Sequence, residues 1–376
     1  MRIVNGRILT PRGFVEGDLF MENGRIAQIG GQTETEGPCL DAQGGYVLPG
    51  FVDVHVHGAY GYATLMGREA IEALTARMPS QGVTSYLPTF AGTPEEHRRI
   101  LQDTREAMGC PGARIAGAHL EGPFVNPERN GAITVESIRP PRLDTLIEMC
   151  GPDLRDVKMM TIAPEMEGAQ AVVEYLADHG VVAAIGHTTA DSATVKAAAD
   201  WGATQASHLY NGMPPMNHRA DTTPVGCFLD DRIHGQIICD GIHVNPAMVR
   251  LAVKFMGVGR IIGITDAMQA AGMPDGEYDF LEGDRKVTVV DGICRLPDGT
   301  LASSTLTMDQ AFRNFVNVIG LTVEEASRVL SYNPARSISL MDRGEIDVGQ
   351  LADVVVLTPQ LILTHTLVGG QVAWKR

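Results

Sequence analysis

The stretch Phe51–Gly58 reads FVDVHVHG, and it indicates both the fold and the site of this chain. Side chains of a β-strand alternate between its two faces, so His55 and His57 lie on one face while three valines line the other. A short apolar run of this kind is typical of a buried strand in a parallel sheet. Two imidazoles near the carboxyl end of such a strand can converge on one metal ion. Taken alone, the pair could equally be two polar residues beside a turn.

Apolar runs of this type recur along the chain and alternate with segments of helical character. Helical segments lie between most of the runs, for example at 68–78, 94–108, 170–179 and 191–201. Eight strands that alternate with helices predict a parallel (β/α)8 TIM barrel in the α/β class. The alternative is an open doubly wound sheet, but no G-x-G-x-x-G turn follows the first strand. The eight runs are 51–57, 83–87, 115–120, 157–161, 181–186, 204–209, 235–239 and 261–265.

Both ends of the chain are rich in β character. Asn5-Gly6 lies between two short apolar runs and predicts a tight hairpin, and Glu22-Asn23-Gly24 predicts a second one. Residues 352–357 and 367–372 resemble them. We therefore expect a small β-sandwich domain formed by residues 1–48 and 344–376, beside a barrel domain of residues 49–343. A β-rich insertion at 276–303 and two helices, near 306–319 and 323–330, should follow the eighth strand.

The composition is that of a globular protein. The chain has 376 residues, of which 44% are hydrophobic and 20% charged, and its formal net charge is −15. Such a chain repels nucleic acid and anionic membranes, although a pocket with an opposing local field can still bind a small anion. No apolar run reaches the roughly 18 residues of a membrane span, and residues 1–7 lack the apolar core of a signal peptide. We expect a cytoplasmic protein without nucleic-acid or membrane partners.

Residues that can bind a metal occur where several of the apolar runs stop. Glu121 follows the third run, His187 and Asp266 follow the fifth and the eighth, and His208 lies at the end of the sixth. The carboxyl ends of all barrel strands meet at one mouth, where active sites lie. A mixture of imidazole and carboxylate donors suits Zn²⁺ or Fe²⁺ better than Mg²⁺ or Ca²⁺.

This set of residues has the parts that hydrolysis of an amide needs. A bound metal lowers the pKa of water from about 15.7 to about 7, which removes roughly 12 kcal/mol of proton affinity. A carboxylate must then take the remaining proton of the hydroxide and pass it to the leaving nitrogen. Asp266 is the candidate, because its place at a strand end puts it beside the metal. An aspartate there could also be a metal ligand or a helix N-cap.

These motifs resemble the amidohydrolase superfamily and, within it, the N-acetylglucosamine-6-phosphate deacetylase family. The resemblance covers nearly the whole chain. The stretch His119–Phe124 is quite specific, since it resembles that family's segment with a glutamate ligand, where many amidohydrolases place a carboxylated lysine. The other matching segments are 49–58, 186–188, 207–211, 240–243, 265–268, 333–335 and 344–357.

The resemblance implies a role for each candidate residue. Glu121, His187 and His208 would hold one metal ion, and His55 and His57 a second one, with Glu121 as the bridge. One or two ions of Zn or Fe per subunit are therefore expected.

For the substrate, Asp266 would be the general base and acid, and His243 would contact the substrate and polarise its acetyl carbonyl. Asn211 and Gly212 would contact the sugar phosphate. Arg219, next to His218, would bind the phosphate, although these two residues could also form a solvated loop. In dimers of this family some phosphate contacts come from the neighbouring chain, so a homodimer is expected.

The implied reaction is deacetylation of N-acetylglucosamine 6-phosphate to glucosamine 6-phosphate and acetate. The sequence departs from the family pattern at Ile133, where the family has a histidine that contacts the sugar, and in the loop 219–226, where it has Arg-Glu-Pro-Gly. The same hydrolysis of another N-acetylated amino sugar, such as N-acetylgalactosamine 6-phosphate, is therefore an alternative. A third possibility is a scaffold that has lost catalysis, although such proteins usually lose metal ligands, and here all are present.

Overall fold

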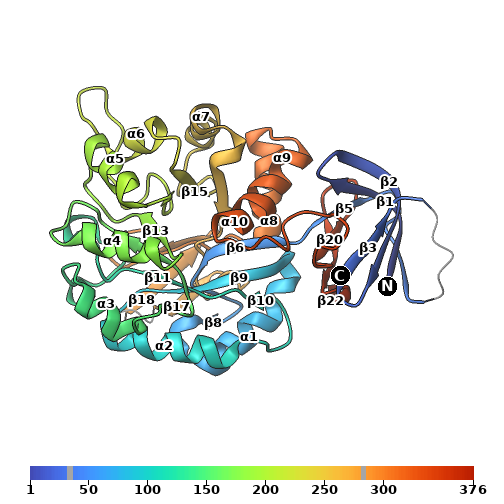
Figure 1. Cartoon of the computed structure of the whole chain (residues 1–376), viewed down its shortest axis with the longest axis horizontal. Coiled ribbons are helices and arrows are strands. Elements are labelled where there is room, and N and C mark those ends of the chain that lie inside the picture. Colours follow the sequence, from blue (N-terminus) through green and yellow to red (C-terminus); the bar gives the residue numbers. More distant parts are fainter. Residues whose placement is uncertain (32–36, 281–284) are drawn as a thin grey trace.

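The computed structural model describes residues 1–31, 37–280 and 285–376. Within them, eight parallel strands follow one another around a barrel in the order of the chain, as predicted (Figure 1). The third predicted strand is interrupted: β10 (Arg114–Ile115) pairs with the middle of β9 and is separate from β11, with Gly117 (φ 134°) between them. The eight are β6 (Phe51–Val56), β9 (Val83–Phe90), β11 (Ala118–Glu121), β12 (Val157–Ile162), β13 (Val182–Ile185), β14 (Gln205–Ala206), β15 (His234–Ile238) and β16 (Ile261–Ile264).

The barrel closes between its first and last strands, β6 and β16. For the residues that the structure describes, this seam has no ladder of paired residues. Instead, the Thr265 hydroxyl donates to Asp53 at 2.6 Å, and the Asp266 N–H donates to the carbonyl of His55 at 2.8 Å. Burial raises the pKa of Asp53 to about 6, against the hydrogen bonds from Thr265 and His55 that lower it. The seam therefore sets β6 beside the end of β16.

Helices surround the strands and share one large apolar core with them (Figure 1). Helix α2 begins with a capping box, in which Thr93 and Glu96 each bond the other's backbone N–H. None of the helices in the described part of the chain is both long and apolar enough to cross a membrane. The helices are α1 (Arg68–Arg77), α2 (Pro94–Ala107), α3 (Leu143–Cys150), α4 (Ala169–Asp178), α5 (Ser192–Trp201), α6 (Thr223–Leu229), α7 (Pro246–Met256), α8 (Met308–Asn314), α9 (Val323–Ser327) and α10 (Asn333–Ser337).

Strands from both ends of the chain form a second, smaller sheet, which confirms that part of the predicted fold (Figure 1). Strand β5 joins the two ends, because it pairs with β1 on one side and with β20 on the other. A separate apolar cluster, which includes Ile8, Val47 and Val354, fills this unit. The predicted domain boundaries stay a prediction. The strands are β1 (Arg2–Thr10), β2 (Gly13–Glu22), β3 (Arg25–Ile29), β4 (Cys39–Asp41), β5 (Tyr46–Pro49), β20 (Val354–Leu357), β21 (Leu363–Val368) and β22 (Gln371–Lys375).

The hairpin predicted at Asn5-Gly6 is wrong. Strand β1 continues through both residues with a shift of register, and the chain turns after Thr10 instead. Asn5 has φ 55°, and its side chain bonds Asp41, while a Cβ at Gly6 would lie 2.5 Å from a methyl group of Val47. The pair therefore makes a bulge where β5 approaches β1 closely. The second predicted hairpin, at Asn23-Gly24, is confirmed.

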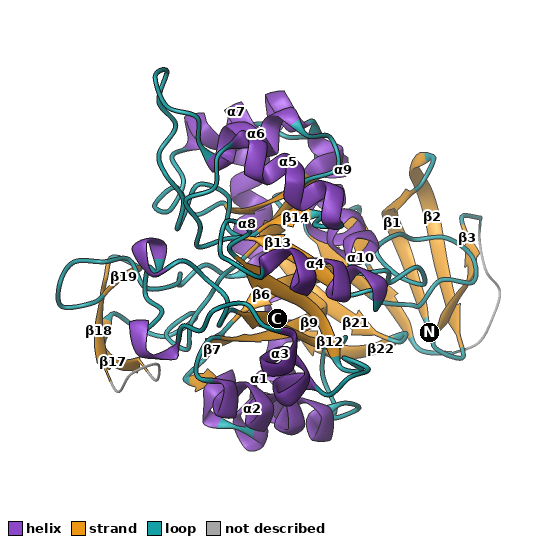
Figure 2. Ribbon diagram, turned by 60° about the vertical axis from the view of Figure 1, so that its left-hand side comes forward, coloured by secondary structure: helices purple, strands orange, loops and turns teal. Residues whose placement is uncertain are grey.

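An antiparallel insertion follows β16, as predicted, and it lies at the opposite end of the molecule from the small sheet (Figure 2). It consists of β17 (Gly276–Phe280), β18 (Arg285–Val290) and β19 (Ile293–Arg295), and residues 281–284 of the predicted segment lie outside the described residues. The hairpin of β7 (Gly58–Ala59) and β8 (Tyr62–Ala63) directly follows β6. The two predicted later helices correspond to α8 and α9, each extended by a π turn.

Gly82 offers a direct test of the packing beneath the first barrel strand. Its φ is 82°, its carbonyl accepts the N–H of Phe51 at 3.0 Å, and a Cβ would lie 2.7 Å from the Phe51 ring. Gly82→Ala should cost about 3 kcal/mol, because steric overlap adds to the backbone penalty. Gly180→Ala, at φ 68° with open space around it, should cost only about 1 kcal/mol. The midpoints of thermal unfolding measure both, and equal midpoints would contradict the packing.

Candidate functional site

A cavity of about 290 Å³ lies at the carboxyl ends of the barrel strands. Eight of the predicted site residues line it: His57, Glu121, His187, His208, Asn211, Gly212, His243 and Asp266. His55 is fully buried beneath it. His218 and Arg219 are exposed and do not line the cavity.

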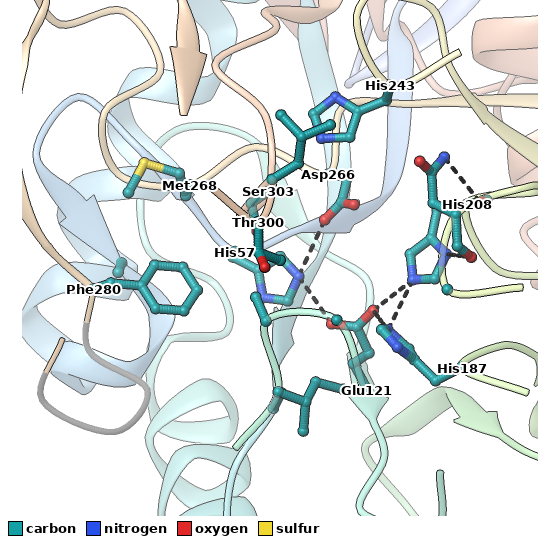
Figure 3. A pocket seen from close by; sticks show the side chains of 18 of the residues that line it. His57, Glu121, His187, His208, His243, Asp266, Met268, Phe280, Thr300 and Ser303 are labelled. Carbon is teal, nitrogen blue, oxygen red and sulfur yellow. Dashed lines mark hydrogen bonds and ion pairs between the residues drawn. The ribbon is translucent and has the colours of Figure 1, made fainter. Parts of the chain in front are cut away.

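Four imidazoles surround the carboxylate of Glu121, which stands at the end of β11. Figure 3 shows three of them, those of His57, His187 and His208. The Nε2 atoms of His208, His187 and His55 lie 2.9, 3.2 and 3.4 Å from its Oε1 atom. The Nε2 atom of His57 lies 3.2 Å from Oε2. His55 lies on β6 and His57 directly follows it, while the loops after β13 and β14 carry the other two rings. The structure therefore brings these five predicted residues together.

Hydrogen bonds fix which nitrogen carries the proton in two of these rings. The Nδ1 atom of His187 lies 2.8 Å from the carbonyl of Arg129, and that of His208 lies 3.1 Å from the carbonyl of Asn211. A carbonyl only accepts, so Nδ1 carries a hydrogen in both rings and Nε2 of the neutral ring presents a lone pair. The two Nε2 atoms are 3.1 Å apart. Two lone pairs and a carboxylate oxygen thus face one point.

His55 is fixed in the same tautomer by a chain of side chains in the barrel interior. Its Nδ1 atom lies 3.1 Å from Oε1 of Gln236, whose amide group donates to Gln205 and Met159. The oxygen of Gln236 therefore accepts from His55, and Nε2 of His55 presents its lone pair to the cavity. This Nε2 atom is fully buried, and among the described residues it has no hydrogen-bond partner.

These donors fit a divalent metal ion. Ligand atoms of Glu121, His187 and His208 all lie within 4.8 Å of one another, and so do those of His55, His57 and Glu121. Buried lone pairs that face each other are unfavourable unless a cation lies between them. The hydrogen bonds from Nδ1 to carbonyls are also those that orient imidazole ligands in metal sites.

Asp266 follows β16 and is close to the same rings. Its Oδ1 atom lies 3.3 Å from Nε2 of His57 and 3.4 Å from Nε2 of His55. Burial opposes its ionisation, but the two imidazoles lower its pKa below the usual carboxyl value. The same balance holds the pKa of Glu121 well below its usual range, with His55 the strongest of the lowering influences. Both carboxylates are therefore ionised at neutral pH.

Several site residues have left-handed backbone conformations. The φ angles are 48° for His187, 29° for His208 and 49° for Asp266. Non-glycine residues rarely adopt such values, and the cost is about 1–3 kcal/mol each. Hydrogen bonds from the surroundings stabilise these backbone conformations. The backbone carbonyl of Asp266, for example, accepts the N–H of Ser304 at 2.7 Å.

His243 lines the cavity and is oriented by Asp240. Its Nδ1 atom lies 2.6 Å from one oxygen of Asp240, and the backbone N–H groups of Ile242 and His243 donate to the other oxygen. Burial lowers the pKa of His243, but Asp240 outweighs it and leaves the pKa raised. With Nδ1 engaged, Nε2 is the nitrogen that can contact a substrate.

Asn211 and Gly212 form part of the cavity wall beside the candidate metal ligands. The Asn211 amide donates to the carbonyl of His208 at 3.2 Å. Gly212 has φ 63°, and a Cβ there would lie 3.0 Å from Nδ1 of His187, so a side chain would disturb that ring. The roles predicted for the site residues remain predictions.

The wall away from the candidate metal ligands carries apolar side chains that sequence reasoning missed. Met268, Phe280 and Leu301 line it, and the first two lie on the side opposite His187 and His208 (Figure 3). Ile133, noted only as a departure from the family pattern, is buried and also lines the cavity. No motif marked Phe280 or Leu301, since both come from the insertion and its flank.

Known proteins resemble the chain over its whole length. The model of the amidohydrolase family matches residues 46–373. An N-acetylglucosamine-6-phosphate deacetylase of Lysinibacillus sphaericus is 35% identical, over 94% of this chain and 92% of the relative. An N-acetylgalactosamine-6-phosphate deacetylase of Escherichia coli O157:H7 is 34% identical, over 98% of this chain and 97% of the relative.

Solved structures agree with these matches. The crystal structure of N-acetylglucosamine-6-phosphate deacetylase from Thermotoga maritima superposes with a TM-score of 0.90 and 34% sequence identity, and all of both chains is covered. The predicted fold class is confirmed by this likeness. The cluster around Glu121 can bind a divalent metal, in keeping with the metal dependence of amidohydrolases. The chain belongs to the amidohydrolase family and, within it, to the N-acetylglucosamine-6-phosphate deacetylase family.

Proposed function

We propose that the chain hydrolyses the acetamide of N-acetylglucosamine 6-phosphate to glucosamine 6-phosphate and acetate. The observation that carries the proposal is the set of imidazole Nε2 atoms around Glu121, with Asp266 beside them. Full-length similarity to N-acetylglucosamine-6-phosphate deacetylases supports the choice of substrate. We also place the protein in the cytoplasm as a homodimer.

Glu121, His187 and His208 would hold one ion of Zn or Fe, and His55 and His57 would hold a second one with Glu121 between them. Such an ion supplies a Lewis acid that polarises the acetyl carbonyl and makes water acidic enough to attack it. The Arg129 carbonyl fixes the neutral tautomer of His187, and Gln236 fixes that of His55. In both rings Nε2 then offers the lone pair that a metal ligand needs.

Asp266 moves the proton in this mechanism. Its lowered pKa keeps it a carboxylate at neutral pH, so it can accept a proton from the attacking water. When the carbon–nitrogen bond breaks, the same group returns this proton to the leaving nitrogen, which departs as the amine. Asp266 therefore accepts and returns the same proton, and the mechanism needs no second general acid.

His243 steadies the acetyl carbonyl. Asp240 engages Nδ1 and raises the pKa of the ring, which favours the doubly protonated form. Its Nε2–H can then donate to the oxygen on which negative charge develops.

The phosphate requires positive charge that the cavity of one subunit does not supply. In the described part of the chain, no lysine or arginine lines the cavity. Arg219 and His218 lie at the turn of the loop between β14 and α6, where Asn217 pairs with Ala220, and this loop projects from the barrel (Figure 1). We propose that they reach the phosphate in the neighbouring subunit of the dimer, where the fork of an arginine suits a phosphate.

Hydrolysis of N-acetylgalactosamine 6-phosphate is the second candidate. Two observations favour it: a deacetylase of that substrate is 34% identical over 98% of this chain, and Ile133 gives the cavity an apolar side chain where the family has a histidine.

Asp266→Asn tests the acid and base role. The amide cannot accept and return a proton, so kcat should fall by about 10²–10⁴-fold, while KM changes little. Release of acetate is the measurement, and the control is Asp178→Asn at the exposed end of α4. A kcat for Asp266→Asn within threefold of the wild type would refute the role.

Metal affinity should fall as the pH falls. In the metal-free protein burial lowers the pKa of His57, but Asp266 and Glu121 outweigh it and raise the pKa to about 10. The ring is therefore protonated below that pH, and a metal must displace this proton, which costs about tenfold in affinity per pH unit. Competition with a chelator at several pH values between 6 and 8 measures it. An affinity for the second ion that does not change with pH would contradict the site.

A panel of sugars, tested with Arg219→Ala, addresses the substrate. N-acetylglucosamine 6-phosphate should give the highest kcat/KM among this ester, its galactosamine epimer and both unphosphorylated sugars. Arg219→Ala should raise KM for the phosphorylated sugars only, while Arg155→Ala, on an exposed turn, should not.

Mixing Arg219→Ala with Asp266→Asn subunits should restore part of the activity if the arginine acts in the neighbouring subunit. A mixture no more active at low substrate concentration than the average of its two parents would place the arginine contact within one chain.

A further inference from the structure

Glu165 is a carboxylate outside the cavity that is almost saturated with hydrogen bonds. It lies in the loop after β12 and is mostly shielded from solvent. Its Oε1 atom accepts from the backbone N–H of Thr189 at 2.6 Å, from the Asn126 amide at 2.8 Å and from the Thr189 hydroxyl at 3.1 Å. Its Oε2 atom accepts from the hydroxyl of Thr188. No role in the reaction described above uses this group.

All of these partners are neighbours of His187. Thr188 and Thr189 follow it directly in the chain, and the backbone N–H of Asn126 donates to the carbonyl of His187 at 2.9 Å. Glu165 therefore joins the segment after β11 to the segment after β13. The two segments enclose His187 from both sides.

His187 needs such support because its backbone is strained. Its φ of 48° is unfavourable for a residue with a side chain, and such a conformation persists only where its surroundings fix it. The ring must also keep Nδ1 on the carbonyl of Arg129, which follows Asn126 in the same segment. A shift of either segment would turn Nε2 away from Glu121.

We propose that Glu165 is a positioning residue that sets the affinity of the Glu121–His187–His208 site for its metal ion. It acts through His187 and rests on the proposed role of His187 as a ligand. Asn126 and the backbone of Thr189 can only donate to it, and the Thr188 hydroxyl already accepts the N–H of Ala190, so it donates too. Both oxygens of a carboxylate are acceptors, so Glu165 can accept the hydrogen bonds of all these donors.

The test is Glu165→Gln, compared with Glu167→Gln two residues further on, where the side chain is exposed. The side-chain amide of glutamine has one acceptor atom and one donor atom, whereas the carboxylate of Glu165 has two acceptors. The variant therefore loses a hydrogen bond to one of the two segments that enclose His187. Competition between the purified protein and a chelator for Zn²⁺ should show roughly 10–100-fold weaker binding of one ion in Glu165→Gln and no change in Glu167→Gln. At saturating Zn²⁺, kcat and KM should return to wild-type values, which a purely structural defect would not allow.

Thr188→Val is the second variant, in case Glu165→Gln does not fold. It removes one hydrogen-bond donor to Glu165 and should also lower the affinity of the same site for Zn²⁺. Unchanged Zn²⁺ affinity in both variants, or a kcat that stays low at saturating Zn²⁺, would overturn the proposal for Glu165. Failure of the wild type to bind Zn²⁺ or Fe²⁺ at all would instead refute the proposed function, so the two failures are distinguishable.

Discussion

Buried lone pairs that face a buried carboxylate are the constraint on which the rest of this structure depends. Glu121 receives the Nε2 atoms of His187 and His208, and in the neutral form of both rings the only N–H donates to a backbone carbonyl. Such an arrangement is repulsive unless a cation fills it. The barrel supplies the geometry: strand ends that are distant in sequence meet at one mouth, and the left-handed backbones direct their side chains inward.

Much of this could be predicted from the sequence, because its signals are periodic or local. The eight strands have apolar runs of the right length, and the alternation in β6 places His55 and His57 on one face. Glu121, His187, His208 and Asp266 are recognisable because each lies where such a run ends. The parallel barrel then requires that these ends meet.

Other features depend on contacts between distant segments, which leave little trace in the sequence. Asn5-Gly6 has the composition of a turn, yet the approach of Val47 makes it a bulge. The tautomer of His187 depends on a backbone carbonyl, and any residue in place of Arg129 supplies one. Phe280 reaches the cavity only through the fold of the insertion.

The small sheet has a consequence for how the protein is made. Strand β5 needs β20 as its partner, and roughly 300 residues separate the two. A ribosome that adds about 5–20 residues per second takes roughly 15–60 s to cover that distance. During this interval one edge of the nascent sheet has no partner, so it is open to pairing with other nascent chains.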